Sequence, residues 1–236
     1  LSIIASAEME GRETGTEGQR KAAAYIESQF KAMGLKPIPA LKGYQQFYPL
    51  YQDSLIKAEL EIGNKDAVSG TDFNTPLTNN ESGKFKSKEI VVAGYGIDDE
   101  KYSDYTDLNV KGKTVIIFLG EPKKDGKYFL NANNRFSEWT FPGISKKLAA
   151  AAAKGAVAVL IINPRQETFN ERAIASGKKT GVYYPRNDTK EKSISYAQLS
   201  HAFAKSIIGD NFDKILNAVK ANSIPDKEWY VTKKIK

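Results

Sequence analysis

The only histidine of the chain, His201, is the side chain best suited to acid–base or metal chemistry. Zinc sites and catalytic triads need several converging ligands or partners, and the sequence has no cysteine to supply them. The HExxH, GxSxG and Walker patterns are also absent from the sequence. His201 falls in a predicted helix, two residues before Phe203. We therefore expect an ordinary helix histidine, and we assign no catalytic, cofactor-binding or metal-ligating residue.

A cluster of carboxylates is the second feature that could do chemistry. It lies in a tyrosine-containing stretch and comprises Asp98, Asp99, Glu100, Asp104 and Asp107. Carboxylate oxygens are hard ligands of the kind that Ca²⁺ prefers. The spacing does not match the calcium-loop template, which alternates acidic positions and then places a glycine. A solvated acidic loop is therefore favoured over a cation site.

Gly94-Tyr95-Gly96 follows a predicted strand, Glu89–Ala93, as phosphate-binding loops often do. The segment lacks the third glycine and the helix that should open beside it. A turn is therefore favoured over a nucleotide site.

A long segment, Gly120–Phe141, separates two apolar runs and is rich in asparagine, lysine and aromatic residues. Connections of this length are uncommon unless they are mobile or serve a function. The aromatic residues of the segment are Tyr128, Phe129, Phe136, Trp139 and Phe141. They are able to form a peptide-binding surface, although core packing explains most aromatic residues.

Two apolar runs must form the framework that positions these segments. Lys113–Leu119 and Ala156–Ile162 are both predicted strands. Ala156–Ile162 does not alternate as a strand with one wet face does, so we expect it to be covered on both faces. Between them, residues 144–154 follow the 3.6-residue period of a helix that Gly155 closes. The pattern predicts two parallel strands joined by a right-handed crossover.

The same helical period assigns the lysines of that segment to solvent. Lys146, Lys147 and Lys154 are expected on the wet side, opposite Leu148 and Ala151.

Capping-box spacing predicts a helix near each end of the chain. Thr16 and Gln19 open one that runs to Met33, and Ser195 and Gln198 open another that Gly209 closes. A short helix capped by Asn211 and a strand at Trp229–Ile235 follow, and Leu55–Ile62 alternates as a half-exposed strand.

The composition favours a folded protein over a nucleic-acid-binding or membrane-spanning one. Of 236 residues, 41% are hydrophobic, and the net charge of +7 comes from 29 lysines and only 6 arginines. Because arginine is the usual reader of bases, a solvated lysine surface is favoured. No apolar stretch approaches the ~20 residues of a membrane helix. No signal peptide is visible, and the first residue is not methionine, so we expect a trimmed N-terminus.

Several motifs in order resemble a known family. EGRETGTEGQRKAAAYI at Glu10–Ile26, followed by Phe30–Leu35, resembles the N-terminal segment of secreted di-zinc aminopeptidases, metallopeptidase family 28. VVAGYGI at Val91–Ile97, DYTDLNVKGKTVIIFLGEP at Asp104–Pro122 and KLAAAAAKGAVAVLIIN at Lys147–Asn163 are similar to the protease-associated (PA) domain inserted in many of them. The match covers most of the chain in the family's order.

The sequence departs from the family where the chemistry should be. In these peptidases the zinc ligands and the general-base glutamate follow the PA domain, in a block beginning with a histidine–aspartate motif, and nothing here matches that block. One helix histidine cannot hold two zinc ions. We carry over no catalytic or metal residue, expect no cofactor in this chain, and expect the two zinc ions in a missing peptidase domain.

The resemblance implies a mixed α/β fold, a β-rich PA sandwich with flanking helices. We expect residues 1–43 to be a helical segment of the peptidase domain and residues 44–209 to be the PA domain. Residues 210–236 would be a helix and strand leading back to the peptidase domain. The helix Thr16–Met33 would then have an under-covered apolar face, because its natural partner is absent.

Three functions follow as hypotheses. The first is the non-catalytic PA portion of a secreted, periplasmic or cell-envelope zinc aminopeptidase, inactive alone, which shapes substrate access or binds substrates and partners. Its partners would be peptide or protein substrates and the missing peptidase domain, with no nucleic acid and no membrane span. The alternative is a stand-alone PA module that binds peptide or protein through Gly120–Phe141. The third, least favoured, is a self-contained hydrolase that uses His201.

Overall fold

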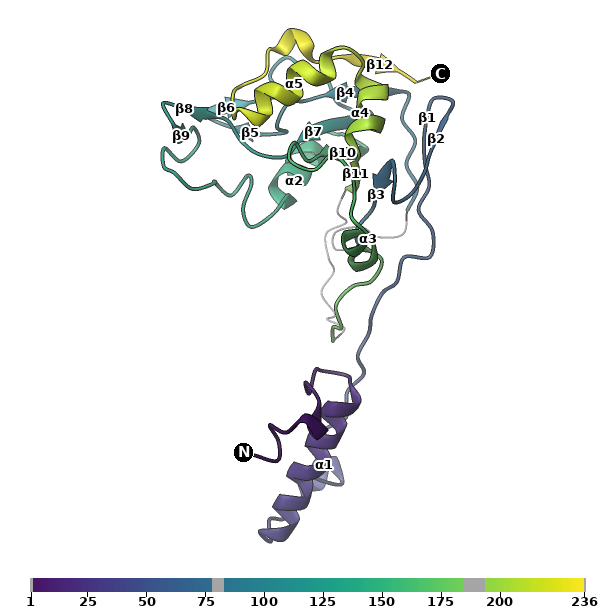
Figure 1. The fold of residues 1–236 in the computed structure, drawn as a ribbon, viewed down its shortest axis with the longest axis vertical. Helices are drawn as coiled ribbons and strands as arrows, with labels where there is room; N and C mark the ends of the chain where they lie inside the picture. The colour runs from purple at the N-terminus through teal and green to yellow at the C-terminus, as the bar shows by residue number, and fades with distance from the viewer. Residues whose placement is uncertain (1, 78–82, 185–193, 236) are drawn as a thin grey trace. The chain divides into compact units, whose positions relative to one another are not determined.

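The computed structural model describes residues 2–77, 83–184 and 194–235. Contacts divide the chain into two units (Figure 1). The first unit comprises Leu1–Asp53 and Thr180–Thr189, and the second comprises Ser54–Lys179 and Lys190–Lys236.

A six-stranded sheet forms the centre of the second unit. In spatial order its strands are β12 (Thr232–Lys234), β4 (Glu89–Val92), β7 (Thr114–Phe118), β10 (Ala158–Ile162), β11 (Ser195–Leu199) and β3 (Phe73–Asn74). The four middle strands run parallel, and the two edge strands pair antiparallel to their neighbours. The predicted parallel pair is confirmed, with β7 and β10 as neighbours in the middle of the sheet.

Helices cover both faces of this sheet (Figure 1). Every residue of β7 and β10 is buried. Val115 and Val159 pack with α2 (Ser145–Ala153) on one face. Ile116 and Leu160 pack with α4 (His201–Ile208) and α5 (Asn211–Lys220) on the other. A strand buried on both sides cannot alternate polar and apolar residues, which explains the unbroken apolar runs.

Small elements surround the sheet. They are the hairpins β1 (Leu60–Ile62) with β2 (Lys65–Ala67), β5 (Asp98–Asp99) with β6 (Tyr102–Ser103) and β8 (Lys123–Lys124) with β9 (Lys127–Tyr128), the helix α3 (Glu171–Gly177) and the 3₁₀ turn η4 (Lys227–Trp229). The half-exposed strand predicted for Leu55–Ile62 is therefore shorter in the structure, beginning at Leu60. Within the described ranges, no helix is long and apolar enough to cross a membrane.

The helix and strand predicted at the C-terminal end are present as α5 and β12, and both belong to the sheet unit. Asn211 does not cap α5, because it is the first helical residue and follows the N-cap Asp210. The strand is shorter than predicted, since it begins at Thr232. Phe212 and Ile215 of α5 lie in the core beside the sheet, and β12 pairs with β4.

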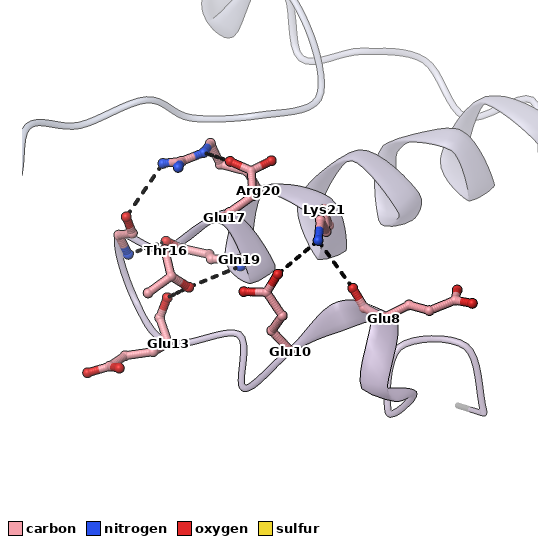
Figure 2. Close-up of polar contacts among 9 residues, drawn as sticks. Glu8, Glu10, Glu13, Thr16, Glu17, Gln19, Arg20 and Lys21 are labelled. Carbon is pink, nitrogen blue, oxygen red and sulfur yellow. Dashed lines mark hydrogen bonds and ion pairs between the residues drawn. The ribbon is translucent and has the colours of Figure 1, made fainter.

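The first unit contains α1 (Glu17–Ala32) and two 3₁₀ turns, η1 (Ala7–Met9) and η2 (Pro39–Leu41). The side chain of Thr16 caps α1 by accepting a hydrogen bond from the Gln19 backbone N–H, at 3.5 Å. Lys21 reaches back from α1 to the Glu10 carboxylate, 2.9 Å away, and to the Glu8 carbonyl oxygen (Figure 2). The predicted capping residue and helix are confirmed.

The apolar face of α1 is under-covered, as predicted. Only Gly18 and Ala22 are buried in this helix. Ile26 is 39% exposed, and Met33, which follows the helix, is 63% exposed.

Two local predictions are wrong. Ser195 does not open a helix, because Ser195–Leu199 is the strand β11; Ser200 instead caps α4 by accepting from the Phe203 N–H. Lys147 is not on the wet side of α2 but fully buried. Its spacing to Ala151 is i,i+4, which places both residues on the same helix face.

The two serines provide a direct test of where α4 begins. We expect Ser200→Ala to lower the free energy of unfolding by roughly 0.5–2 kcal/mol, because the first turn of α4 loses its cap. Ser195→Ala, the matched control in β11, should change it by less than about 0.5 kcal/mol. Urea unfolding followed by circular dichroism measures both values. A larger loss for Ser195→Ala than for Ser200→Ala contradicts the assignment.

Candidate binding site at the carboxyl ends of the central strands

A small cavity lies where β7 and β10 end. Its volume is about 150 Å³, and its walls come from the loops after both strands, from the 120–141 segment and from the last turn of α5. The lining residues are Leu119, Gly120, Phe136, Thr140, Asn163, Pro164, Arg165, Val219, Lys220 and Asn222. Pockets for drug-sized molecules usually measure roughly 300–1,000 Å³. This cavity is therefore large enough for one side chain and too small for a typical cofactor.

Backbone and side-chain hydrogen bonds hold these loops in place. Leu119 N–H donates to Ile162 C=O at 2.9 Å, which continues the pairing of β7 and β10 beyond their ends. The Asn163 side chain accepts from the Arg165 N–H at 3.1 Å, and the Asn163 carbonyl oxygen lies 2.8 Å from His201 Nε2. Asn222 Nδ2 donates to the Glu121 carbonyl at 3.3 Å. The cavity wall is thus anchored to the sheet and to α4.

The aromatic residues of Gly120–Phe141 divide between core and surface. Trp139 is 3% exposed and donates from Nε1 to Asp99 Oδ2 at 3.1 Å. Tyr128 is also buried, and the ring of Phe136 packs against it with centroids 4.6 Å apart. Phe136 and Phe141 remain 39% and 70% exposed. Core packing therefore explains Trp139 and Tyr128, and the peptide-binding surface stays a prediction for Phe136 and Phe141.

Two cations lie on the cavity wall without a carboxylate partner. Arg165 and Lys220 are exposed, and neither forms an ion pair with any residue that the structure describes. The described lining residues include no aspartate or glutamate. The site therefore combines positive charge, one aromatic ring and several amide or hydroxyl groups.

Sequence reasoning identified the aromatic segment of this site but missed Asn163, Arg165, Lys220 and Asn222. A usable signal existed for the first two, because they directly follow a buried parallel strand. In open α/β sheets, ligands bind outside the carboxyl ends of such strands. Lys220 and Asn222 come from the end of α5, whose position against this edge no local pattern indicates.

The family model of the PA domain matches residues 76–207, which is more than half of the chain. The chain belongs to the PA domain family. That match covers the four parallel strands β4, β7, β10 and β11 and the helix α2. The cavity-lining loops after β7 and β10 lie within it, whereas β3, β12 and the cavity residues from the end of α5 lie outside it.

Two solved structures resemble the chain in part. They are an aminopeptidase from Aneurinibacillus sp. strain AM-1, 17% identical with a TM-score of 0.38, and a zinc aminopeptidase from Bacillus subtilis, 16% identical with a TM-score of 0.36. The matches cover 94% and 88% of this chain but 39% and 40% of those proteins, so the chain spans about two fifths of their length. No curated protein matches the chain. Likeness at this level carries no inference about activity.

A buried polar cluster lies elsewhere in the sheet unit, around Asp104. Its Oδ1 accepts hydrogen bonds from the hydroxyls of Tyr102 and Tyr230, at 2.6 and 3.2 Å, and its Oδ2 accepts from the Ile97 N–H at 3.0 Å. Burial raises the pKa of Asp104 to about 6, although these three donors favour the charged form. The sequence placed Asp104 in a solvated loop, and this prediction is wrong, because the residue is 1% exposed.

Lys147 is a buried cation whose charge interacts with that carboxylate. Its Nζ donates to the Tyr95 carbonyl at 2.6 Å and to the Gly120 carbonyl at 2.9 Å. Burial lowers the pKa of Lys147 to about 7, and the charges of Asp104 and Glu121 oppose that shift. The ammonium therefore ties the loop after β4 to the loop after β7, directly behind the cavity wall at Gly120.

Gly94 and Gly96 allow neighbouring side chains to lie close to the backbone of the turn after β4. Both have positive φ, at 42° and 68°. A Cβ on Gly94 would collide with Tyr230 Oη and Asp104 Oδ1, and one on Gly96 would lie 2.6 Å from Ile117 Cγ2. The segment is a turn, as favoured from the sequence, and its glycines are required by close side-chain approach.

The remaining acidic residues are engaged separately. Asp98 pairs with Lys154 at 2.8 Å, and Asp99 accepts from Trp139. Among residues 2–77, 83–184 and 194–235, no three His, Cys, Asp or Glu side chains gather closely enough to hold a metal ion. His201 is 8% exposed, its Nε2 lies 2.8 Å from the Asn163 carbonyl oxygen, and its ring packs edge-on against Phe212, at 5.7 Å between centroids.

A second, larger hollow of about 540 Å³ lies at the amino ends of β4 and β7. Four lysines line it, and one of them, Lys113, already pairs with Glu89 at 2.8 Å. Its lining includes no aromatic residue. It combines exposed lysines with one lysine–glutamate ion pair and has no apolar ring for a side chain to contact, so we regard the smaller cavity as the better candidate site.

The pKa of Asp104 predicts how stability depends on pH. Because the folded pKa, about 6, exceeds the ordinary value of 3.8, its contribution to stability is complete below about pH 4 and is lost as pH rises through 6. Asp104→Asn should remove this slope. It should also cost roughly 1–3 kcal/mol, because the NH2 group of asparagine replaces one of two oxygens that accept hydrogen bonds, from the Ile97 N–H or from the tyrosine hydroxyls. Urea unfolding between pH 4 and 7 measures both effects.

Asp107→Asn is the matched control, since Asp107 is exposed with a φ of 63°, which asparagine tolerates. It should keep the wild-type slope and nearly the wild-type stability. Equal pH slopes for the wild type and Asp104→Asn would show that Asp104 does not titrate in this range.

Proposed function

We propose that this chain is the N-terminal segment and PA domain of a longer, zinc-dependent aminopeptidase of metallopeptidase family 28. In this proposal the PA domain is non-catalytic and binds peptide substrates or controls their access to the active site. The PA domain at residues 76–207 is the observation that carries the proposal. The resemblance of Glu10–Ile26 to the N-terminal segment of such peptidases supports the enzyme context.

The exposed apolar face of α1 supports a missing partner domain. Ile26 and Met33 would gain burial from such a domain, and each fully buried large apolar side chain contributes about 1.5–3 kcal/mol. We propose the peptidase domain as that partner.

The residues described here do not fit a di-zinc centre. A pair of zinc ions needs several His, Asp or Glu ligands, and the described residues offer no such group. On the proposal, the zinc ligands and the general base lie in the peptidase domain, and no catalytic step is assigned to residues of this chain. We propose a secreted, periplasmic or cell-envelope location as part of the same proposal, because the peptidases that the chain resembles are secreted.

A stand-alone PA module that binds peptide or protein is the second candidate. The observation that favours it is the surface position of Phe136 and Phe141, which suits peptide contact without any further domain. Both candidates share the binding role and differ in whether a peptidase domain continues the chain.

Sequencing the coding region beyond Lys236 separates the two candidates. We expect an open reading frame that encodes a histidine–aspartate motif after a strand, followed by further His, Asp and Glu ligands. A stop codon directly after Lys236 would contradict the peptidase proposal and leave the stand-alone module.

A hydrolysis assay checks the inactivity expected of this chain. Residues 1–236 with added zinc should release no more nitroaniline from aminoacyl 4-nitroanilides than His201→Ala does, because the contacts of His201 within the described residues are a backbone carbonyl and the Phe212 ring. Zinc-dependent turnover that His201→Ala abolishes would overturn the non-catalytic role.

A further inference from the structure

We propose that the cavity at the carboxyl ends of β7 and β10 binds the carboxylate of an acidic side chain in a peptide. Arg165 and Lys220 would hold the carboxylate, and Phe136 would contact the methylene groups. This inference rests on the proposed peptide-binding role of the PA domain and adds the chemical class of residue that it recognises.

The charges on the cavity wall carry the argument. Arg165 and Lys220 come from different elements, the loop after β10 and the last turn of α5, yet both line one cavity of about 150 Å³. Neither forms an ion pair with a described residue, and no carboxylate is among the described lining residues. Two unpaired cations beside one small cavity favour an anionic occupant.

Arg165 is well placed to be the main contact. Its backbone is fixed by the hydrogen bond from its N–H to Asn163 Oδ1, and the Asn163 carbonyl oxygen is in turn within 2.8 Å of His201 Nε2. A guanidinium group binds a carboxylate through two parallel hydrogen bonds. The fixed backbone of the loop therefore restricts the positions that the Arg165 guanidinium group can reach.

Lys220 contributes less net charge than its ammonium suggests. It lies in the last turn of α5, where the helix dipole places partial negative charge. Its ammonium partly offsets that charge, so Arg165 supplies most of the attraction for an anion. The two residues should therefore have unequal effects on binding.

The remaining walls favour a side chain over a free anion. Phe136, Leu119 and Val219 supply apolar surface that a small inorganic anion would not contact. The cavity volume fits one side chain and excludes a larger ligand. A glutamate combines two methylene groups with a carboxylate, which matches this mixture of walls.

Thr140 supplies an independent observation at the same cavity. Its Oγ1 is buried and has no hydrogen-bond partner in the described structure, although the residue lines the cavity. A buried hydroxyl without a partner is destabilising, because it has lost its hydrogen bonds to water. Rotation about its Cα–Cβ bond would turn the hydroxyl toward an occupant, which would then supply the missing partner.

Fluorescence anisotropy with labelled pentapeptides tests the proposal on the full chain. Three probes are compared: a capped peptide with central glutamate, the same peptide with glutamine, and the glutamine peptide with a free C-terminal carboxylate. We expect the glutamate peptide to bind about tenfold more tightly than the capped glutamine peptide, and more weakly as salt rises. Tighter binding of the free-acid peptide than of the glutamate peptide would overturn side-chain recognition.

Variants assign the effect to the cavity. Arg165→Gln should reduce the affinity for the glutamate peptide about tenfold, and Lys220→Gln about threefold, with no change for the capped glutamine peptide. Lys124→Gln, an exposed lysine of β8 outside the cavity, is the matched control and should leave both affinities unchanged. Circular dichroism melts check that each variant folds.

The outcomes separate this inference from the proposed function. Peptide binding that ignores the glutamate, or that survives both cavity variants, overturns the carboxylate site and leaves the peptide-binding role intact. Displacement of the glutamate peptide by inorganic phosphate at equal concentration shows a general anion site and also overturns side-chain recognition. Failure of every peptide to bind at millimolar concentration contradicts both.

Discussion

Burial of β7 and β10 on both faces is the constraint on which the rest of the structure depends. With α2 on one face and α4 and α5 on the other, the side chains of these strands cannot reach solvent. Function is therefore left to the residues beyond the strand ends. At the carboxyl ends these are Leu119 and Gly120 after β7 and Asn163 to Arg165 after β10, which form part of the cavity lining.

Buried polar side chains hold the loops at this edge of the sheet in place. Lys147 joins the Tyr95 carbonyl to the Gly120 carbonyl, and Asp104 binds two tyrosine hydroxyls and the Ile97 N–H. Isolated buried charges are costly, and these are tolerated because each has several hydrogen-bond partners. The cavity wall thus has a fixed backbone, while Phe136 and Arg165 remain exposed on it.

The sequence predicted the features that depend on local pattern. The unbroken apolar runs indicated the parallel strands, Gly155 marked the end of α2 with a φ of 84°, and Thr16 capped α1. The start of α4 was misplaced because a capping-box spacing at Ser195 coincided with a buried strand. Burial of Lys147 and convergence of Arg165 with Lys220 depend on tertiary packing between distant segments, which no local period encodes.

The central claim is that this PA domain binds peptide at the carboxyl edge of its sheet. Amide chemical-shift mapping by NMR, with a mixture of capped peptides, tests it without assuming a ligand sequence. The account predicts that the perturbed amides cluster at Gly120, Phe136, Arg165 and Asn222. Shifts confined to the lysine-lined hollow around Lys88 and Lys111, or no shifts at any peptide concentration, would contradict it.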